Sequence, residues 1–256
     1  MITAKLQGGL GNYMFQIAAA ESLGIKNNDS VVFSELDCTS CHTNVSTYKF
    51  NIFRNINISH QALNLIKYDY SEPEFSYNEI PYVKDMRLIG YFQSEKYFDK
   101  DKINDLFKIP SVIEEFITHN YGYLLNEPTC SIHVRRGDYL KHPNHHPLCS
   151  MDYYNKAMAL MPTGTKYLVF SDDIKWCREN FIGEQFEFIE GLKDVVDLYL
   201  MAYCNNNIIA NSSFSWWGAW LNNNVNKIVV APKIWFGPAK SNMSTKDLIP
   251  EKWIIV

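Results

Sequence analysis

The segment CSIHVRRGDY, residues 130–139, places charged residues directly after a short run that is typical of a strand. We predict a strand over residues 131–135. Similar runs recur towards the C-terminus, separated by helix-length segments, at residues 166–170, 186–189, 207–210, 227–231 and 253–256. Strands that alternate with helices pair in parallel. This part of the chain is therefore predicted to form one complete layer of the Rossmann type.

The N-terminal segment shows the same alternation. Residues 2–6 are predicted to form a strand and residues 8–11 a glycine turn, and the apolar residues after the turn form one face of a helix that ends near Gly24. Val31–Phe33 is predicted to be the next strand. A second series of parallel α/β units therefore occupies this part of the chain.

A change of pattern separates the two series. Residues 48–125 are rich in aromatic residues and Asn and show no regular order of elements, and Asn126-Glu127-Pro128 breaks the helix predicted before it. We therefore predict an α/β protein with two Rossmann-like domains and parallel sheets, one over residues 1–128 and the other over residues 129–256.

Composition excludes several classes of partner. The chain has a formal net charge of −4, with 46% hydrophobic and 20% charged residues, and no run of Lys or Arg is longer than two. It lacks the basic patches with which proteins bind nucleic acids or anionic membranes. No apolar run reaches the ~18 residues of a membrane-spanning helix, and no leader pattern stands at the N-terminus. We predict a cytoplasmic protein with no transmembrane segment, and peripheral membrane contact is left open.

Six cysteines are too sparse for a disulfide scaffold, and we interpret all of them as reduced. Cys38 and Cys41 have C-x-x-C spacing, but no second pair and no paired histidines complete a zinc site. The histidine-rich loop 142–147 matches no regular ligand spacing, and Asp99-Lys100-Asp101 is typical of a solvated helix start. We therefore expect no metal site.

Open parallel sheets bind ligands beyond the carboxyl ends of their strands. The first such position is the glycine turn, where Gly9 and Gly11 let the backbone approach an anion at a helix N-terminus. Gly9-x-Gly11 also begins a dinucleotide fingerprint, and Glu35 or Asp37 stands where the ribose-binding acid is expected. Met14 occupies the place of the third glycine, which weighs against that interpretation. A purely structural turn is the other alternative.

Arg135 and Arg136 directly follow the strand 131–135, so two guanidinium groups converge on the predicted crevice of a net-acidic chain. Planar, permanently charged guanidinium suits bidentate binding of phosphate. His133 stands beside them. The alternative is that Asp138 forms an ordinary surface salt bridge with one of the arginines.

A strand also ends, and a helix begins, within residues 211–221. Ser212 is a suitable N-cap, and the amides of Ser213 and Phe214 are donors that can cradle a second phosphate. An ordinary capped helix is the alternative.

Asp172 and Asp173 follow the strand 166–170. A guanine base presents two adjacent hydrogen-bond donors, and one carboxylate can accept from both at once. The alternative is an N-cap for the helix that follows, and spacing alone does not decide between the two residues.

Four segments together resemble one family. They are H-x-R-R-x-D at residues 133–138, NSSFSWWGAW at 211–220, GGLGNYMFQ at 8–16 and SDD at 171–173, of which the first three are the most specific. They are similar to motifs of the bacterial α-1,2-fucosyltransferases of glycosyltransferase family 11. Tyr13 stands where relatives commonly have Gln. The resemblance covers nearly the whole chain and implies a GT-B-type fold, with an acceptor-side domain over residues 1–128 and a GDP-sugar-binding domain over 129–256.

The resemblance also implies an activity: inverting transfer of L-fucose from GDP-fucose to the 2-hydroxyl of a terminal β-galactoside on a glycan acceptor, with no metal or other cofactor. Arg135 would contact the leaving β-phosphate, Asn12 would lie near that phosphate and the acceptor, and Asp138 is a further catalytic candidate. The implied nucleotide contacts are Gly9, Gly11, His133, Arg136, Asp172 or Asp173, Ser212, Ser213 and Phe214.

The identity of the general base and the class of function each leave two alternatives open. Besides Asp138, the candidates for the general base are His145 and His146, because they follow the phosphate-binding strand and imidazole has a suitable pKa. The other classes of function are an NAD-dependent oxidoreductase that uses the N-terminal glycine turn and a non-catalytic protein that binds a sugar nucleotide or glycan.

Overall fold

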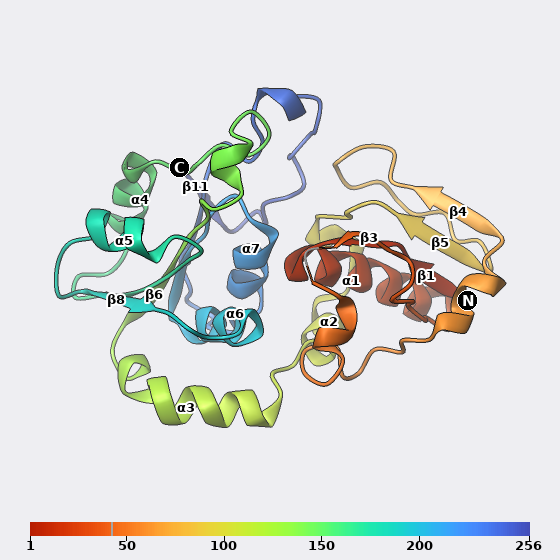
Figure 1. Ribbon diagram of the computed structural model, residues 1–256, viewed down its shortest axis with the longest axis horizontal. Coiled ribbons are helices and arrows are strands. Elements are labelled where there is room, and N and C mark those ends of the chain that lie inside the picture. Colours follow the sequence, from red (N-terminus) through yellow and green to blue (C-terminus); the bar gives the residue numbers. More distant parts are fainter. Residues whose placement is uncertain (42) are drawn as a thin grey trace. The chain divides into compact units, whose positions relative to one another are not determined.

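The computed structural model describes residues 1–41 and 43–256, with the backbone alone at residues 39–41 and 60–62. The chain divides into two compact units (Figure 1), one of residues 1–110 with 243–250 and the other of residues 111–242 with 251–256. The predicted boundary after residue 128 falls inside the second unit, between α3 (Ser111–Leu125) and β6 (Thr129–Val134).

The second unit contains one sheet of six parallel strands. In chain order they are β6, β7 (Lys166–Ser171), β8 (Phe186–Ile189), β9 (Asn206–Ile208), β10 (Val229–Ala231) and β11 (Ile254–Ile255). In space they follow the order β11-β10-β9-β6-β7-β8, and every neighbouring pair is parallel. The strand order therefore reverses between β6 and β9, the topological switch point beside which Rossmann-type sheets bind ligands. The predicted Rossmann-type layer is confirmed.

Helices cover both faces of this sheet. α4 (Met151–Met158) and α5 (Ile174–Asn180) lie on one side, and α6 (Asp194–Tyr203) and α7 (Ser213–Trp220) lie on the other (Figure 1). Ile132 of β6 shares a buried core with Tyr154 of α4 and with Phe181, which follows α5. Trp216 and Trp217 of α7 are completely buried, so these large aromatic side chains fill the core.

The first unit is built around α1 (Leu10–Asn27), most of whose residues are buried. A parallel sheet contains β1 (Ile2–Ala4), β5 (Met86–Ile89) and β4 (Tyr68–Ser71) in that order, and β2 (Leu6–Gly8) pairs in parallel with β3 (Cys38–Cys41). The strand predicted over residues 2–6 is thus divided into two short strands, and Val31 and Phe33 take part in isolated bridges.

The other helices that the structure describes are short. They are α2 (Lys100–Leu106) and the 3-10 helices Val45–Tyr48, His60–Leu65, Glu95–Tyr97, Tyr139–Lys141 and Pro238–Lys240. Within the described ranges, no helix has both the length and the apolar character needed to cross a membrane.

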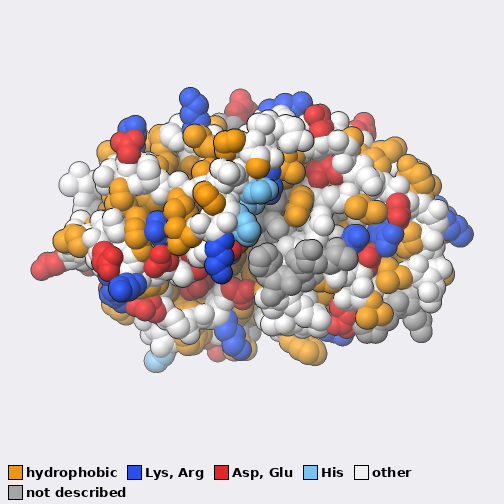
Figure 2. Space-filling model, turned by 45° about the horizontal axis from the view of Figure 1, so that its top comes forward, with side chains coloured by type: hydrophobic (Ala, Val, Ile, Leu, Met, Phe, Trp, Pro, Cys, Tyr) orange, Lys and Arg blue, Asp and Glu red, His pale blue; other side chains and the backbone are white. Residues whose placement is uncertain are grey.

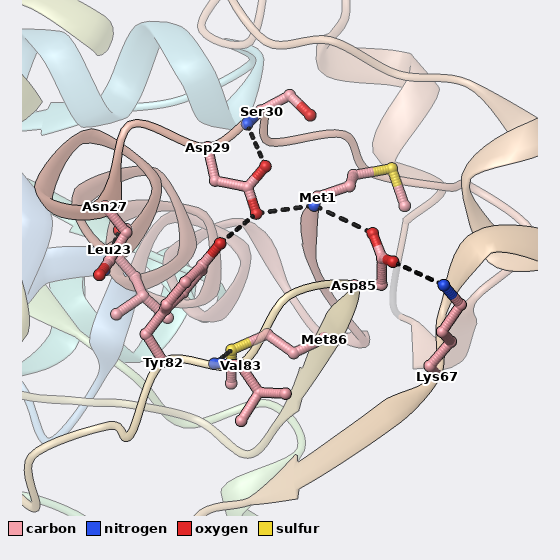
Figure 3. Close-up of polar contacts among 10 residues, drawn as sticks. All are labelled: Met1, Leu23, Asn27, Asp29, Ser30, Lys67, Tyr82, Val83, Asp85 and Met86. Atoms are coloured by element: carbon pink, nitrogen blue, oxygen red, sulfur yellow. Dashed lines mark hydrogen bonds and ion pairs between the residues drawn. The ribbon is translucent and has the colours of Figure 1, made fainter.

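The amino group of Met1 joins three segments of the first unit (Figure 3). It lies 2.7 Å from Asp29 Oδ2 and 3.3 Å from Asp85 Oδ1. Asp29 also accepts a hydrogen bond from the Tyr82 hydroxyl at 3.0 Å, and Lys67 Nζ lies 3.0 Å from the other oxygen of Asp85. Hydrogen bonds from Lys67 and the amino group lower the pKa of Asp85. The start of β1 is therefore held against the residues that follow α1 and those that precede β5.

One expectation about the cysteines is wrong. Cys38 is disulfide-bonded, whereas Cys130, Cys149, Cys177 and Cys204 are free thiols. A low cysteine content excludes a scaffold of many disulfides, but it does not show which sulfur atoms the fold brings within bonding distance.

Candidate functional site

Arg135 follows β6 and lies between two carboxylates. Its Nη2 atom is 2.8 Å from Asp138 Oδ1, and its Nη1 atom is 3.0 Å from Asp172 Oδ2. The guanidinium carbon also lies 5.7 Å from the centre of the Tyr139 ring. The salt bridge to Asp138 that the sequence left as an alternative is therefore present. The Arg135 side chain is nevertheless 32% exposed, so a ligand can still reach its positive charge.

Gly137 gives Asp172 the space to reach Arg135. A Cβ atom at position 137 would lie 2.8 Å from Asp172 Oδ2, closer than real side chains come. Any other residue there would push the carboxylate away from the guanidinium. The space that Asp172 needs thus explains why a glycine stands at position 137.

Arg136 is held more tightly than Arg135. Its Nε atom donates to Asp173 Oδ2 at 3.0 Å, and its guanidinium carbon lies 4.1 Å from the centre of the Trp176 ring, a cation–π contact. Its backbone N–H donates to Asp172 Oδ1 at 2.8 Å. Asp173 also accepts from the Trp176 amide and caps α5, the structural role that the sequence left open. Both aspartates are thus bound to arginines, and their reading of guanine stays a prediction.

His133 is a buried histidine at the end of β6. Burial, with a smaller contribution from the nearby charge of Arg135, lowers its pKa to about 3, so the imidazole is neutral at pH 7. Its ring lies 5.6 Å from that of Phe214. Nδ1 makes no hydrogen bond within the described part of the chain. A neutral ring with an unused nitrogen can donate to or accept from a ligand hydroxyl or base.

The turn from β9 to α7 is fixed by Asn211. The Asn211 side-chain NH₂ group donates to the carbonyls of Pro147 at 2.9 Å and Trp235 at 3.0 Å, and the main-chain carbonyl of Asn211 accepts from the Tyr139 hydroxyl at 2.9 Å. Ser212 occupies the N-cap position of α7, as predicted, but its side chain makes no capping hydrogen bond. The first turn of α7 therefore begins without the side-chain cap that an ordinary capped helix has.

These segments meet at one edge of the sheet. β6 pairs with β7 on one side and with β9 on the other, all in parallel, so the residues after the three strands lie along the same carboxyl edge. Arg135 and Ser212 flank the switch point between β6 and β9. Sequence reasoning missed the roles of Tyr139, Trp176 and the bonding of Asn211. Tyr139 lies within a few positions of the two arginines, and Trp176 lies three residues after Asp173, so their positions were the available signal.

His146 of the histidine loop 142–147 is held close to an aromatic ring and a lysine. His146 stacks on Tyr139 with ring centres 4.7 Å apart, and its Nε2 atom lies 2.9 Å from Lys240 Nζ. Burial, and next the charge of Lys240, lower the pKa of His146 to about 4. His142 and His145 are exposed, and Figure 2 shows histidine side chains gathered beside Lys and Arg on one face. Of the candidate bases, Asp138 is ion-paired and His146 is only weakly basic.

Asn12 and the glycine turn belong to the first unit. Gly9 is the N-cap of α1, and a Cβ atom added to it would meet nothing within 4 Å, whereas Gly8 has a φ of +87° and abuts the Asn12 side chain. Asn12 Oδ1 accepts from Gln93 Nε2 at 2.8 Å. Gly11 is buried within α1. Tyr13 is buried too, and its hydroxyl donates to the Thr43 carbonyl, so this substitution for the common Gln serves the core.

Two further predictions concern acids and metals. Asp37, a ribose-binding candidate for a dinucleotide, is bound by the Arg87 guanidinium, with Nη1 3.1 Å from Oδ2. In the ranges that the structure describes, no group of three or more His, Cys, Asp or Glu side chains could hold a metal ion. Metal independence of the reaction stays a prediction.

Comparison with known proteins gives matches over the full length. Residues 1–256 match the model of glycosyl transferase family 11. The chain is 33% identical to the O-antigen biosynthesis glycosyltransferase WbnK of Escherichia coli, over 94% of this chain and 97% of that protein. It is 31% identical to an alpha-1,2-colitosyltransferase of Escherichia coli, over 99% and 98% of the two chains. Mouse galactoside alpha-(1,2)-fucosyltransferase 1 is 28% identical over 61% of this chain and 46% of that protein.

Solved structures show the same fold. The NodZ alpha-1,6-fucosyltransferase, soaked with GDP-fucose, superposes with a TM-score of 0.54 over 86% of this chain and 92% of that chain, at 14% sequence identity. The expected α/β class, with parallel sheets and the GT-B-like fold of fucosyltransferases, is therefore confirmed.

Proposed function

Because the chain belongs to glycosyl transferase family 11, we propose that it transfers L-fucose from GDP-fucose to the 2-hydroxyl of a terminal β-galactoside, with inversion at the anomeric carbon. The observation that carries the proposal is Arg135, held by two carboxylates and still partly exposed at the switch point of the second unit's sheet. A guanidinium held in this way would need little reorganisation to bind a diphosphate, which supports the proposal.

The chemistry follows from where charge develops. The galactoside oxygen forms a bond to C1 of fucose while the bond from C1 to the β-phosphate oxygen breaks. The electron pair of that bond leaves with GDP, and the hydroxyl proton passes to a base. Arg135 would stabilise the negative charge that grows on the β-phosphate, and the first turn of α7, near Ser213 and Phe214, would hold the diphosphate. Metal-free transfer is part of this proposal.

Other residues would bind the nucleoside. His133, neutral and with Nδ1 unused in the described structure, would contact the ribose or base. Asp172 or Asp173 would accept the donors of guanine. Each already binds an arginine, so guanine would share the carboxylate rather than occupy an idle one.

Similarity to a colitosyltransferase favours a second donor, GDP-colitose, whose sugar lacks only the 3-hydroxyl of L-fucose. A purified enzyme should be supplied with GDP-fucose, GDP-colitose, GDP-mannose and UDP-galactose, each with a β-galactoside, and the product linkage determined by NMR. We expect an α-1,2-linked 6-deoxy sugar from GDP-fucose. Transfer from GDP-colitose alone would overturn the donor assignment but leave the reaction class intact.

The two other classes of function are tested by a thermal-shift assay with NAD and the GDP-sugars, read together with the transfer assay. Thermal stabilisation by NAD and by no GDP-sugar would favour an oxidoreductase. Stabilisation by GDP-fucose without turnover on any galactoside would favour a binding protein. Cytoplasmic location and the absence of a nucleic-acid partner belong to this proposal as well.

A further inference from the structure

The loops that follow β6 and β10 meet around Lys240, and we infer that this lysine is a further phosphate-binding residue of the second unit, held in place by His146. Neither residue belongs to the four segments that resemble the family. That the phosphate is the diphosphate of a sugar nucleotide rests on the proposed function, whereas the geometry lies entirely within the second unit.

Two loops beyond the carboxyl edge of the sheet are fixed to each other. One contains residues 139–147 and follows β6, and the other contains residues 232–240 and follows β10. The Gly237 amide donates to the His145 carbonyl at 3.0 Å. A Cβ atom at position 237 would lie 2.4 Å from the Asn144 carbonyl oxygen, so the two backbones can approach this closely only because a glycine stands there.

Asn211 joins both loops to the strand between them. Its side-chain NH₂ group donates to the carbonyls of Pro147 in the first loop and Trp235 in the second. It follows β9, and β10, β9 and β6 are parallel neighbours in the sheet. The loops that carry His146 and Lys240 therefore stand beside the switch point, at the edge where such sheets bind ligands.

Lys240 forms no ion pair with an acidic side chain in the part of the chain that the structure describes. Its Nζ atom lies 2.9 Å from His146 Nε2 and 5.1 Å from the centre of the Phe236 ring, both of which are neutral groups. Asp138, which lies close enough to act on His146, is bound by Arg135 at 2.8 Å. The Lys240 side chain is half-buried, and burial lowers its pKa. An ammonium group that has lost part of its hydration without gaining a counter-ion is stabilised by an anionic ligand.

His146 orients the ammonium group. Because an ammonium has only donors, His146 Nε2 is the acceptor and the ring proton is on Nδ1. The imidazole ring stacks on Tyr139 with centres 4.7 Å apart, and the Tyr139 ring lies 5.7 Å from the guanidinium carbon of Arg135. Lys240 is thus connected to Arg135 through two rings. Of its three N–H donors, two remain for a ligand after the bond to His146.

A phosphate group suits this arrangement. Its oxygens accept charge-assisted hydrogen bonds from an ammonium group, which binds phosphate as a point charge. His146 Nδ1 is buried and has no hydrogen-bond partner within the described ranges. Buried donors are normally paired, so this second donor in the same cluster also favours a ligand rich in acceptors. The histidine that was weighed as a general base is, on this inference, a positioning residue.

Calorimetry with inorganic pyrophosphate measures the effect on the full chain without any sugar. Lys240→Met should weaken binding about tenfold or more, because it removes a charge-assisted hydrogen bond. Lys240→Arg keeps the charge and should bind within about threefold of wild type. Lys233→Met removes a charge from an exposed position of the same loop and is the matched control, with unchanged affinity.

Three results would overturn the inference. The first is wild-type affinity in a Lys240→Met protein that keeps its circular dichroism spectrum. The second is an equal loss in Lys233→Met, which would reduce the effect to net charge. The third is a wild-type protein that binds no pyrophosphate. If Lys240→Met does not fold, a Lys240→Arg affinity far below that of wild type has the same meaning.

A double-mutant cycle measures whether His146 acts through Lys240. His146→Phe keeps an aromatic ring beside Tyr139 but removes the acceptor for the ammonium. It should weaken pyrophosphate binding about threefold in the wild-type background and not at all in Lys240→Met. Equal losses in both backgrounds would show that His146 does not position Lys240.

Transfer kinetics separate this inference from the proposed function. With GDP-fucose and a β-galactoside, Lys240→Met should raise KM for the donor about tenfold. If the wild-type protein transfers no fucose while Lys240→Met still loses affinity for pyrophosphate, the proposed function fails and the phosphate-binding residue stands. If fucose is transferred and Lys240→Met changes neither KM nor pyrophosphate affinity, this inference alone is wrong.

Discussion

At the level of single residues, the neighbours Arg135 and Arg136 have different surroundings. Arg135 is held by Asp138 and Asp172 and is 32% exposed. Arg136 is bound by Asp173, stacks on Trp176 and is 15% exposed. Both arginines follow the end of β6, and their different partners leave one guanidinium accessible and the other packed.

Arg135→Lys should lose kcat by roughly 100-fold or more, because lysine keeps the charge but not the planar two-pronged donor that the growing charge on the β-phosphate requires. Arg136→Lys should lose less. Steady-state kinetics of both variants with GDP-fucose and a β-galactoside test the pair. A near-normal kcat in Arg135→Lys would refute the assignment, and a worse Arg136→Lys would reverse it.

Alanine substitutions of Asp172 and Asp173 should distinguish an effect on GDP binding from an effect on stability. Asp173 caps α5 and binds Arg136, so Asp173→Ala should cost about 1 kcal/mol of stability, or a few °C in Tm. Asp172→Ala should affect Tm less, because α5 keeps its cap. Calorimetry with GDP then identifies the carboxylate that reads guanine by its large loss of affinity. If neither variant alters that affinity, the base is bound elsewhere.

At the level of elements, prediction from the sequence succeeds best where an apolar run is buried along its whole length. β6 is buried along its whole length and α7 is buried almost throughout, and both were expected near their observed bounds. Residues 48–125 could not be interpreted from the sequence because short elements follow one another there in no regular order: 3-10 helices, the short strands β4 and β5, and the helices α2 and α3. The bond from Gln93 to Asn12 joins residues far apart in sequence and could not be read from any motif.

α1 carries a half-buried acid, Glu21, that should make stability depend on pH. Burial raises the pKa of Glu21 from its ordinary value of 4.5 to about 7. The folded state then binds a proton that the unfolded state has already released, so this contribution is present below pH 4.5 and is lost as the pH rises to about 7. Glu21→Gln should therefore be more stable than wild type by a few °C at pH 8 and nearly equal to it at pH 4.5.

Thermal denaturation of both proteins across this pH range measures the effect. Glu79→Gln is a suitable control, because Glu79 is 75% exposed and its ion pair with Lys26 is a surface pair of little strength. A difference between wild type and Glu21→Gln that does not change with pH would contradict the assignment.

At the level of the whole molecule, charge distribution matters more than net charge. The chain carries a formal net charge of −4, so an anionic sugar nucleotide meets no general attraction and must be bound by local groups. Arg135 and Arg136 stand at the switch point with three aspartates paired to them, so the partly exposed guanidinium of Arg135 is the positive group of this pair that a ligand can reach. The N-terminus of α7 adds its partial charge. Sequence motifs could predict which residues these are because they follow strands of a regular sheet. The carboxylates that orient the arginines became visible only in three dimensions.

This distribution leads to the last prediction, that transfer continues in a chelator. In enzymes that use Mg²⁺ or Mn²⁺, the ion neutralises the diphosphate as the glycosidic bond breaks. Here two guanidinium groups and the first turn of α7 are expected to provide that neutralisation, with donors that are already oriented. Initial rates with GDP-fucose should therefore agree within about twofold with and without EDTA, and added Mg²⁺ or Mn²⁺ should restore nothing, since there is no loss to restore. Increasing salt should instead raise KM for the donor, because ionic strength screens the partly exposed charge of Arg135. An enzyme that stops in EDTA and recovers with a divalent ion would show that the arginines do not suffice and that a metal completes the site.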